Sequence, residues 1–448
     1  MLSLRDKTFP GGIHPPDSKQ ETNELAIRPF PFAPVMVIPL LQHIGKPAVA
    51  VVQEGEEVAR GQLLARADGF KSVPIHAPAS GVVSKIALVP SLYGTMVPGI
   101  YLTPWPGSTQ EVVEDKPCPL DADVSDILDA IQQAGIVGLG GAAFPTHVKL
   151  KIPTDKFVDT LIINGVECEP YLTTDHRVML EQSADIFMGI RYLLNATGAE
   201  RAVIALEANK ADAAQLLLQA APADLPVAVE VLAVKYPQGA EKMLIKALLN
   251  REVPTGAHAV DVHVVGVNVA TAAEIGRLLP HGRGIQERVI TITGPAIEHK
   301  GNYRIPIGTP LRFALDQVGV VDDVSRVFFG GPMMGQAVPN LDIPITKGTS
   351  GIVAFTSQET GDRSIVYPCI HCGHCLDACP MGLNPSQLGL LAKVERYALM
   401  KEQFHLMDCF ECGACSYVCP AHIPLVHFFR VAKERFRVAK RADGRKNL

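Results

Sequence analysis

The chain carries, near its C-terminal end, the stretch Cys369-Ile-His-Cys372-Gly-His-Cys375-Leu-Asp-Ala-Cys379-Pro380. The same pattern returns in Cys409-Phe-Glu-Cys412-Gly-Ala-Cys415-Ser-Tyr-Val-Cys419-Pro420. Both copies have the spacing C-x2-C-x2-C-x3-C-P, which is typical of polypeptides that hold two [4Fe–4S] clusters. Each iron of a cubane takes one thiolate, so three cysteines on one loop hold three corners and a fourth cysteine comes from elsewhere. The two stretches therefore predict two iron–sulfur clusters.

The ligands are expected to cross between the two stretches, because the last cysteine of each run serves the other cluster in this arrangement. One cluster would take Cys369, Cys372, Cys375 and Cys419. The other would take Cys409, Cys412, Cys415 and Cys379. A pair of zinc knuckles is an alternative, although zinc sites usually separate two C-x2-C pairs by a spacer. Disulfides are a weaker alternative, since no secretory segment indicates an oxidising compartment.

Length and composition bound the rest of the chain. With 448 residues, three or four domains are expected, and a hydrophobic content of 47% is ample for their cores. The formal net charge of −5 gives no indication of nucleic-acid binding. No run approaches the roughly 18 apolar residues of a membrane span, and Met1–Pro10 lacks the apolar region of a signal peptide. We therefore expect a soluble cytosolic protein that docks onto partners.

Residues 1–115 predict an extended arm followed by a β-rich domain. The arm contains Gly11-Gly12-Ile13-His14-Pro15-Pro16, which has too much Gly and Pro for regular structure. Short β runs, separated by turn residues, follow at Val35–Pro39, Ala48–Val52, Gln62–Ala67 and Val82–Ile86. The stretches Val51–Leu64 and Ile75–Val83 resemble the biotinyl/lipoyl carrier fold, a flattened barrel-sandwich of paired hairpins. Lys71 lies near the place of a lipoyl lysine, but the usual flanking residues are missing, so a bracing role is favoured over modification.

Residues 120–280 predict a Rossmann-like α/β domain, because strands and helices alternate as they do in a parallel sheet covered by helices. The expected elements are a helix at Val124–Ala134, a strand at Phe157–Ile163, a helix from Asp175 towards Asn195, a strand at Arg201–Leu206, a helix at Lys210–Ala220, a strand at Val227–Val234, a helix at Glu241–Asn250 and a strand at Val260–Val267. Ligands of such sheets bind at the carboxyl ends of the strands. The residues expected there are Asn164, Glu167, Glu169, the turn Lys235–Gly239 and Asn268.

A glycine-rich loop precedes the first strand of this predicted sheet, with the sequence Gly138-Leu139-Gly140-Gly141-Ala142-Ala143-Phe144-Pro145-Thr146-His147-Val148-Lys149. Its backbone N–H groups can approach a phosphate, and Lys149 can neutralise one. The loop follows a predicted helix and not a strand, so it is not a Rossmann fingerprint. It also lacks the glycine and the hydroxyl that flank a Walker lysine. Taken alone, such a loop is more often a tight turn than a phosphate site.

Several motifs together resemble those of the flavin subunit of respiratory complex I. Gly138–Lys149 resembles its Gly-Arg-Gly-Gly-Ala-Gly-Phe-Pro-Thr-Gly-x-Lys motif. Asn164–Pro170, Gly239–Glu241 and Asn268–Thr271 resemble its Asn-Ala-Asp-Glu-x-Glu-Pro, Gly-Glu-Glu and Asn-Val-Glu-Thr motifs. The order of a carrier-like domain, this flavin domain, a β-grasp module and two cluster motifs resembles the RnfC component of the ion-translocating Rnf electron-transport complex. That resemblance covers essentially the whole chain.

The resemblance implies a pocket for FMN and NADH. The residues implied for the FMN phosphate and ribityl chain are Gly138, Gly140, Gly141 and Lys149. The residues implied for the isoalloxazine edge and the ribityl hydroxyls are Asn164, Glu167, Asn268 and Thr271, and Gly239 belongs to the same pocket. Glu169 and Phe144 would help to place NADH, while a helix-capping role is the alternative for Glu167 and Glu169. Leu139, Ala143 and Val166 depart from the Arg, Gly and Asp of complex I, which bears on flavin affinity and nucleotide geometry but not on the fold.

The remaining segments complete the predicted multidomain architecture. Residues 285–355 match, by resemblance, a soluble-ligand-binding β-grasp module. Its Gly330-Gly331 and Met333-Met334 could touch a ligand, although a structural bridge between flavin domain and clusters is favoured. Residues 360–430 predict an α-helical, ferredoxin-like domain with two clusters. Residues 431–448 form a basic tail, which is either a solvated helix end or a contact for an acidic partner or anionic headgroups.

The resemblance implies the electron-input subunit of a membrane-bound, ion-translocating oxidoreductase. NADH would transfer hydride directly to FMN, so no catalytic side chain is expected, and single electrons would then pass through two [4Fe–4S] clusters to partner subunits. These partners would be iron–sulfur and membrane-embedded subunits. They would hold the chain peripherally on the cytoplasmic side of the bacterial inner membrane. A ferredoxin-type adaptor without a catalytic flavin and a soluble diaphorase subunit are the alternatives.

Overall fold

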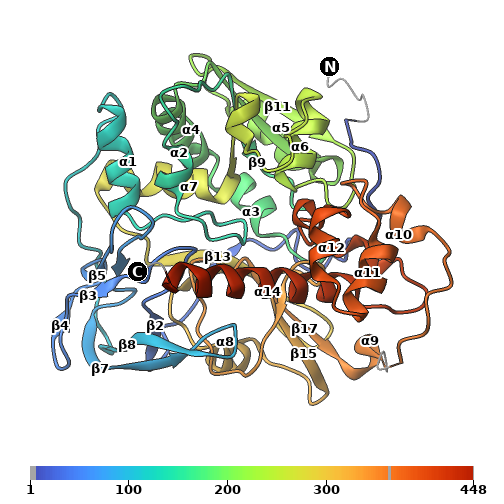
Figure 1. Cartoon of the computed structure of the whole chain (residues 1–448). Coiled ribbons are helices and arrows are strands. Elements are labelled where there is room, and N and C mark those ends of the chain that lie inside the picture. Colours follow the sequence, from blue (N-terminus) through green and yellow to red (C-terminus); the bar gives the residue numbers. More distant parts are fainter. Residues whose placement is uncertain (1–6, 362–364, 447–448) are drawn as a thin grey trace.

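The computed structural model describes residues 7–361 and 365–446, with side chains described through residue 438. Within these residues the strands form four sheets, and each part of the chain has its own apolar core (Figure 1). None of the helices in these ranges combines the length and the apolar character that crossing a membrane requires.

Two small antiparallel sheets form the N-terminal β domain. One sheet has the order β2 (Met36–Pro39), β8 (Met96–Pro104), β7 (Gly81–Pro90) and β4 (Glu57–Val58). The other has the order β3 (Val49–Ala50), β5 (Leu63–Arg66) and β6 (Ile75–His76). Side chains from both sheets, among them Ile38, Leu64, Ile75 and Leu102, share one buried core. The expected barrel-sandwich is therefore present, and each predicted β run overlaps one of these strands.

A four-stranded parallel sheet forms the next domain. Its strands, in spatial order, are β11 (Val227–Leu232), β10 (Arg201–Glu207), β9 (Thr160–Asn164) and β12 (Val264–Asn268). Alternate side chains of β9 point to opposite faces: Leu161 and Ile163 join the core beneath α4 (Ser183–Thr197), α5 (Ala211–Ala220) and α7 (Val269–Leu278). Ile162 joins a second core beneath α6 (Glu241–Leu249). The sheet is thus covered on both faces, as predicted.

Two of the predicted elements of this domain are wrong in detail. The helix expected from Asp175 to Asn195 is two helices, α3 (Thr174–Glu181) and α4, because Gln182 adopts φ −129° and ψ 31° and leaves the helical region. The strand expected at Val260–Val267 begins only at Val264. Residues Ala259–Val262 form a 3-10 turn instead, since the Asp261 carboxylate accepts from the backbone N–H of His258 and His263 takes a left-handed φ of +64°.

A mixed six-stranded sheet follows in the chain. Its order is β1 (Ile27–Pro29), β14 (Gly301–Pro306), β13 (Glu287–Thr293), β17 (Gly351–Thr356), β15 (Val324–Phe329) and β16 (Gln336–Ala337). The apolar face of α8 (Leu311–Val318) packs on it. The assignment of this part as a β-grasp module stays a prediction.

The cysteine motifs lie in a helical module. Its helices are α10 (His374–Asp377), α11 (Pro385–Lys393), α12 (Tyr397–Glu402), α13 (Ala414–Tyr417) and α14 (Leu425–Lys446). Gly373 and Gly413 both have φ +82° and begin the short helices α10 and α13, so each cysteine loop turns sharply at its glycine. The long α14 runs from this module along the face of the molecule towards the β domain (Figure 1). Residues 431–446 of the predicted basic tail lie in α14, whereas residues 447 and 448 and the side chains beyond residue 438 lie outside the described part.

The N-terminal arm connects several of these parts. The backbone N–H of Gly12 donates to the Ala378 carbonyl of the cluster module, and Ile13 forms a bridge with Tyr236 of the parallel-sheet domain. Farther along, β1 pairs in parallel with β14 of the mixed sheet. The arm is therefore extended, as expected, but it is built into three domains and does not belong to the barrel-sandwich alone.

Candidate functional site

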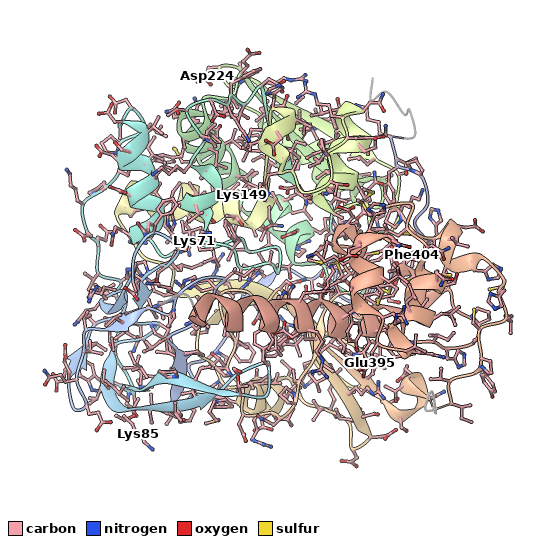
Figure 2. The ribbon with its side chains drawn as sticks, viewed as in Figure 1. Lys71, Lys85, Lys149, Asp224, Glu395 and Phe404 are labelled. Atoms are coloured by element: carbon pink, nitrogen blue, oxygen red, sulfur yellow. The ribbon has the colours of Figure 1, made fainter. Side chains whose placement is uncertain are left out.

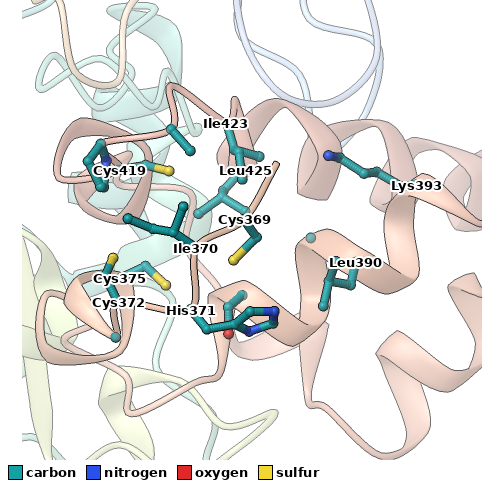
Figure 3. A pocket seen from close by; sticks show the side chains of 15 residues that line it. Cys369, Ile370, His371, Cys372, Cys375, Leu390, Lys393, Cys419, Ile423 and Leu425 are labelled. Carbon is teal, nitrogen blue, oxygen red and sulfur yellow. The ribbon is translucent and has the colours of Figure 1, made fainter. Parts of the chain in front are cut away.

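Four cysteines from both motifs line one cavity of the helical module. They are Cys369, Cys372, Cys375 and Cys419 (Figure 3). Ile370, Leu390 and Ile423 add apolar walls to this cavity. Cys375 is buried and Cys372 is exposed, so one corner of the site meets the solvent. The structure thus brings together the four thiols expected for one cluster, including the one from the second motif, and none of them forms a disulfide.

The other four cysteines form a second group, with no exposed member. They are Cys379, Cys409, Cys412 and Cys415. Burial, together with the nearby Cys409 and Cys379 thiols, raises the pKa of Cys412 to about 12. Thiolates in such surroundings are stable when a metal shares their charge. In the described ranges, no three His, Cys, Asp or Glu side chains converge where a single metal ion would fit. Each group of four thiols draws one member from the other motif, which is the ligand set expected for two clusters.

A larger cavity of about 560 Å³ opens at the carboxyl ends of β9 and β12. Pockets of roughly 300–1,000 Å³ are typical for cofactors of nucleotide size. All the residues predicted for FMN and NADH line this cavity except Gly141: the set is Gly138, Gly140, Phe144, Lys149, Asn164, Glu167, Glu169, Gly239, Asn268 and Thr271. The cavity lies where a topological argument places ligands of a parallel sheet, and its size and lining fit a flavin mononucleotide.

The glycine-rich loop lines this cavity and is held in place by contacts with Thr271 and Asn268. The backbone N–H of Leu139 donates to the Thr271 hydroxyl over 2.9 Å, so Thr271 holds the loop. A Cβ added to Gly140 would stand 3.2–3.3 Å from the Asn268 side chain, and Gly141 has φ +99°. Gly141 therefore needs glycine for its backbone conformation, and at Gly140 any side chain would have to displace Asn268 slightly.

A buried guanidinium supports the same loop. Leu139 occupies the position at which complex I has arginine, and it is buried in the core. Arg288 of β13 reaches the loop from the mixed sheet, and its Nη2 donates to the Leu139 carbonyl over 2.9 Å. Burial lowers the pKa of Arg288 to about 10, so it remains charged at neutral pH. Arg288 was not among the residues predicted from the sequence, although a charged residue directly before the β-branched run Val289–Thr293 is a signal for it.

Glu167 and Asn268 organise the helix ends that face the cavity. The Glu167 carboxylate accepts from the backbone N–H groups of Asp175 (3.0 Å) and His176 (3.4 Å), in the first turn of α3. The Asn268 side chain caps α7 by accepting from Ala270 and Thr271, and its Nδ2 donates to the Asp175 carboxylate over 2.7 Å. Glu167 thus has the capping role that was the alternative, and it also lines the cavity.

Glu169 joins the cavity to a loop of the mixed sheet. Its carboxylate accepts from the backbone N–H groups of Met333 (3.1 Å) and Met334 (2.7 Å). Burial raises the pKa of Glu169, while these two N–H donors oppose the shift. A Cβ on Gly413 would stand 3.0 Å from the Met333 carbonyl, so this loop also touches the second cysteine group. Residues 330–335 therefore form a bridge between cavity and cluster module.

Three further contacts shape the cavity. Lys149 forms an ion pair of 2.6 Å with Glu241, and both side chains are more than one third exposed. Such an exposed pair is weak, so the ammonium can turn to a phosphate at little cost. A Cβ on Gly239 would stand 2.4 Å from the Val166 carbonyl, and the Asn164 Nδ2 donates to the Gly239 carbonyl over 2.9 Å. The turn after β11 therefore approaches the cavity only with glycine.

The cavity lies against the second cysteine group and not against the first. Phe410, which follows Cys409, lines the cavity. Tyr236 lines it too, and its hydroxyl donates to the Cys412 carbonyl over 2.6 Å. Tyr236, Ile13 and Ala378 share one small apolar core with Cys412. The turn that carries Tyr236 was expected at a strand end, but its contact with the cluster loop is a tertiary feature that the sequence did not reveal.

The barrel-sandwich braces the glycine-rich loop from outside. The backbone N–H of Ile44 donates to the Ala143 carbonyl over 3.0 Å, and a ring nitrogen of His147 lies 2.7 Å from the Phe70 carbonyl. Lys71, next to Phe70, is exposed (Figure 2). These contacts favour the bracing role of the domain.

Three family models match consecutive parts of the chain. The barrel sandwich hybrid domain of RnfC matches residues 7–104, the Nuo51 FMN-binding domain matches residues 131–277, and the 4Fe-4S dicluster domain matches residues 368–423. These descriptions agree with the barrel-sandwich, with the parallel sheet that carries the large cavity, and with the two cysteine groups.

Curated relatives match nearly the whole chain. A component of the proton-translocating ferredoxin:NAD(+) oxidoreductase complex of Clostridium ljungdahlii is 42% identical over 447 residues, covering 97% of this chain and 95% of the relative. The corresponding component of the Na(+)-translocating ferredoxin:NAD(+) oxidoreductase complex of Acetobacterium woodii is 40% identical over 448 residues, covering 99% and 100%. Among solved structures, NAD+-reducing [NiFe]-hydrogenase in the H2-reduced state matches with a TM-score of 0.49 and 19% identity, covering 74% of this chain and 68% of that chain.

Proposed function

Because this chain belongs to the RnfC family of ion-translocating ferredoxin:NAD(+) oxidoreductase complexes, we propose that it exchanges electrons between NADH and partner subunits of such a complex. The single observation that carries the proposal is the contact between the large cavity and the second cysteine group through Tyr236 and Phe410. A nucleotide-sized cavity that touches one of two adjacent cluster sites is the arrangement that electron transfer out of the cavity requires.

FMN is the cofactor that the cavity fits, and when bound it supplies the conversion of a two-electron hydride into single electrons. The residues of this chain bind the cofactor and orient it. The glycine-rich loop offers backbone N–H groups, and Lys149 offers a positive charge to the FMN phosphate. Asn164, Glu167 and Asn268 stand at the strand ends, where the polar edge of the flavin would lie. Phe144 and Glu169 are proposed to place NADH.

The two clusters then act in a definite order. The cluster of Cys379, Cys409, Cys412 and Cys415 is proposed to be the one next to the flavin, because Phe410 and Tyr236 belong to the cavity wall. The cluster of Cys369, Cys372, Cys375 and Cys419 is proposed to face the partner, because Cys372 is exposed. The chain is proposed to lie peripherally at the cytoplasmic side of the bacterial inner membrane, held by iron–sulfur and membrane-embedded subunits.

The experiment that tests this function uses the full chain, reconstituted anaerobically with FMN, iron and sulfide. NADH should bleach the flavin absorbance and produce the EPR signals of reduced clusters. Replacing Cys412 by Ser should leave flavin reduction by NADH intact and abolish transfer to an added one-electron acceptor, whereas Cys372→Ser should leave the cluster next to the flavin reducible. Cluster reduction by NADH that survives Cys412→Ser unchanged would contradict the proposed order.

The alternatives from the sequence are not supported. A ferredoxin-type adaptor without a flavin would not require a cavity lined by residues from all four flavin-type motifs. A soluble diaphorase subunit would not explain the barrel-sandwich, which matches the RnfC model and braces the glycine-rich loop.

A further inference from the structure

We propose that Asp175 is the acid–base residue of the large cavity, which gives up and takes back the proton that accompanies hydride transfer to the flavin. This inference rests on the proposed function, and it changes the expectation that no side chain takes part in the chemistry. It is carried by the position of the carboxylate, by the groups around it and by the proton balance of the reaction.

The position of Asp175 is unlike that of the other cavity carboxylates. It stands in the first turn of α3 and lines the cavity. Its Oδ2 accepts from the Nδ2 of Asn268 over 2.7 Å. No Lys or Arg side chain of the described residues forms an ion pair with it. Glu167 and Glu169, in contrast, each use both carboxylate oxygens to accept backbone N–H groups, so these two are held as structural acceptors.

Some of the groups around Asp175 raise the pKa of its carboxyl and others lower it. Burial opposes ionisation, as does Glu167, from the loop after β9. Asn268 at the start of α7, Arg288 of β13 and Lys210, in the 3-10 turn before α5, favour the ionised form. The net result raises the pKa of Asp175 to about 7. A group that exchanges a proton during turnover works best when its pKa lies near the working pH.

Hydride alone would give the anionic reduced flavin, so formation of the two-proton form needs a proton donor. Reduction of a flavin by NADH moves one hydride from the nicotinamide and takes up one proton, so NADH, flavin and one proton give NAD+ and the two-proton reduced flavin. With FMN and the clusters bound, two single-electron transfers to the cluster site would then release both protons. In the forward direction the protonated Asp175 carboxyl supplies the one proton and is left as carboxylate, and it takes back one of the two protons on reoxidation. The other returns to water in the cavity.

The test compares Asp175→Asn with wild type in the full chain loaded with FMN and clusters. Asparagine keeps the size and can still accept from Asn268, but it cannot exchange a proton. For wild type, we expect the rate of flavin reduction by NADH in stopped flow to change with pH around a transition near 7. For Asp175→Asn, we expect that transition to disappear and the rate to fall about 10²-fold or more. Asp175→Glu should restore a pH transition, at a displaced pH.

A matched control is Asp224→Asn, the same chemical change at an aspartate whose side chain is 68% exposed and lies at the outer edge of the parallel-sheet domain (Figure 2). Its pH profile should equal that of wild type. A readout independent of turnover is infrared difference spectroscopy of the FMN-free chain. A carboxyl band that titrates near pH 7 in wild type should be missing in Asp175→Asn.

The outcomes are separable. Equal pH profiles for wild type and Asp175→Asn, with normal FMN binding, overturn the role of Asp175 and leave the proposed function standing. A wild-type chain whose bound flavin is not reduced by NADH overturns both. If Asp175→Asn fails to bind FMN, two other readouts decide. An Asp175→Glu profile without any pH transition, or a wild-type carboxyl band that does not titrate near pH 7, refutes the inference.

Discussion

Replacing Tyr236 by Phe tests the junction between the cavity and the second cluster loop. The Tyr236 side chain is 1% exposed, and its hydroxyl donates to the Cys412 carbonyl over 2.6 Å. Phenylalanine keeps the ring and its packing against Ile13 and Ala378, but the Cys412 carbonyl loses its donor. Leaving a buried acceptor without a partner costs about 1–3 kcal/mol, and because this hydrogen bond is part-buried we take the lower part of that range, about 1.4 kcal/mol. Since about 1.4 kcal/mol is a factor of ten in an equilibrium constant, the 409–415 loop should open roughly tenfold more often.

The assay is anaerobic release of iron to a chelator from the reconstituted chain, followed by the visible absorbance of the clusters. Tyr236→Phe should accelerate one of the two release phases roughly tenfold and leave the other unchanged. FMN affinity should stay within twofold of wild type, about 0.4 kcal/mol. Tyr93→Phe, at a tyrosine that is 79% exposed, is the control. Release kinetics of Tyr236→Phe that match those of Tyr93→Phe would refute the argument that this hydrogen bond holds the loop in place.

Three further changes have calculable outcomes. Because burial raises the folded-state pKa of Asp175 from 3.8 to about 7, the folded chain holds this proton more tightly than the unfolded chain. Wild type should therefore lose stability as the pH rises from about 4 to 7, and Asp175→Asn should be more stable by up to roughly 4 kcal/mol at pH 8 and equal at pH 4, measured by urea unfolding at both pH values. Glu169→Gln weakens two hydrogen bonds to a charged acceptor, so the free energy of opening of residues 330–335 should fall by about 2 kcal/mol. Faster amide hydrogen exchange of these residues, measured by mass spectrometry, would report this change. Ala143 has a left-handed φ of +48°, so Ala143→Gly should stabilise the FMN-free chain by up to about 1 kcal/mol in thermal unfolding, where a lower midpoint would contradict the strain.

Local patterns were sufficient for most of the fold. The parallel-sheet domain has strong strand–helix alternation, and its strands and helices appear near their expected places. The strand expected at Val260–Val267 shows why boundaries are harder. This run is apolar enough for a strand, but its first part forms a 3-10 turn that ends at His263. The hydrogen bond that stabilises the turn joins the Asp261 side chain to the backbone of His258.

The candidate site was only partly accessible from the sequence. The cysteines and the glycine-rich loop could be predicted because their chemistry needs fixed spacings. Asp175 and Arg288 could not, because their importance depends on partners 93 and 149 residues away, Asn268 and Leu139. Tyr236 belongs to the same class: its partner Cys412 is 176 residues away. Such pairs form only when distant segments of one domain, or two different domains, pack together, and no local spacing encodes them.

The position of the N-terminal arm has a consequence for biogenesis. Residues 7–29 are synthesised before their neighbours Asn302 and Ala378, which follow several hundred residues later in the chain. Since domains generally fold in the order of their synthesis, β1 must wait for β14, and Gly12 must wait for the cysteine-rich module that carries Ala378. Closure of the arm would then be a late event in the maturation of the chain, after the cysteine-rich module has been made.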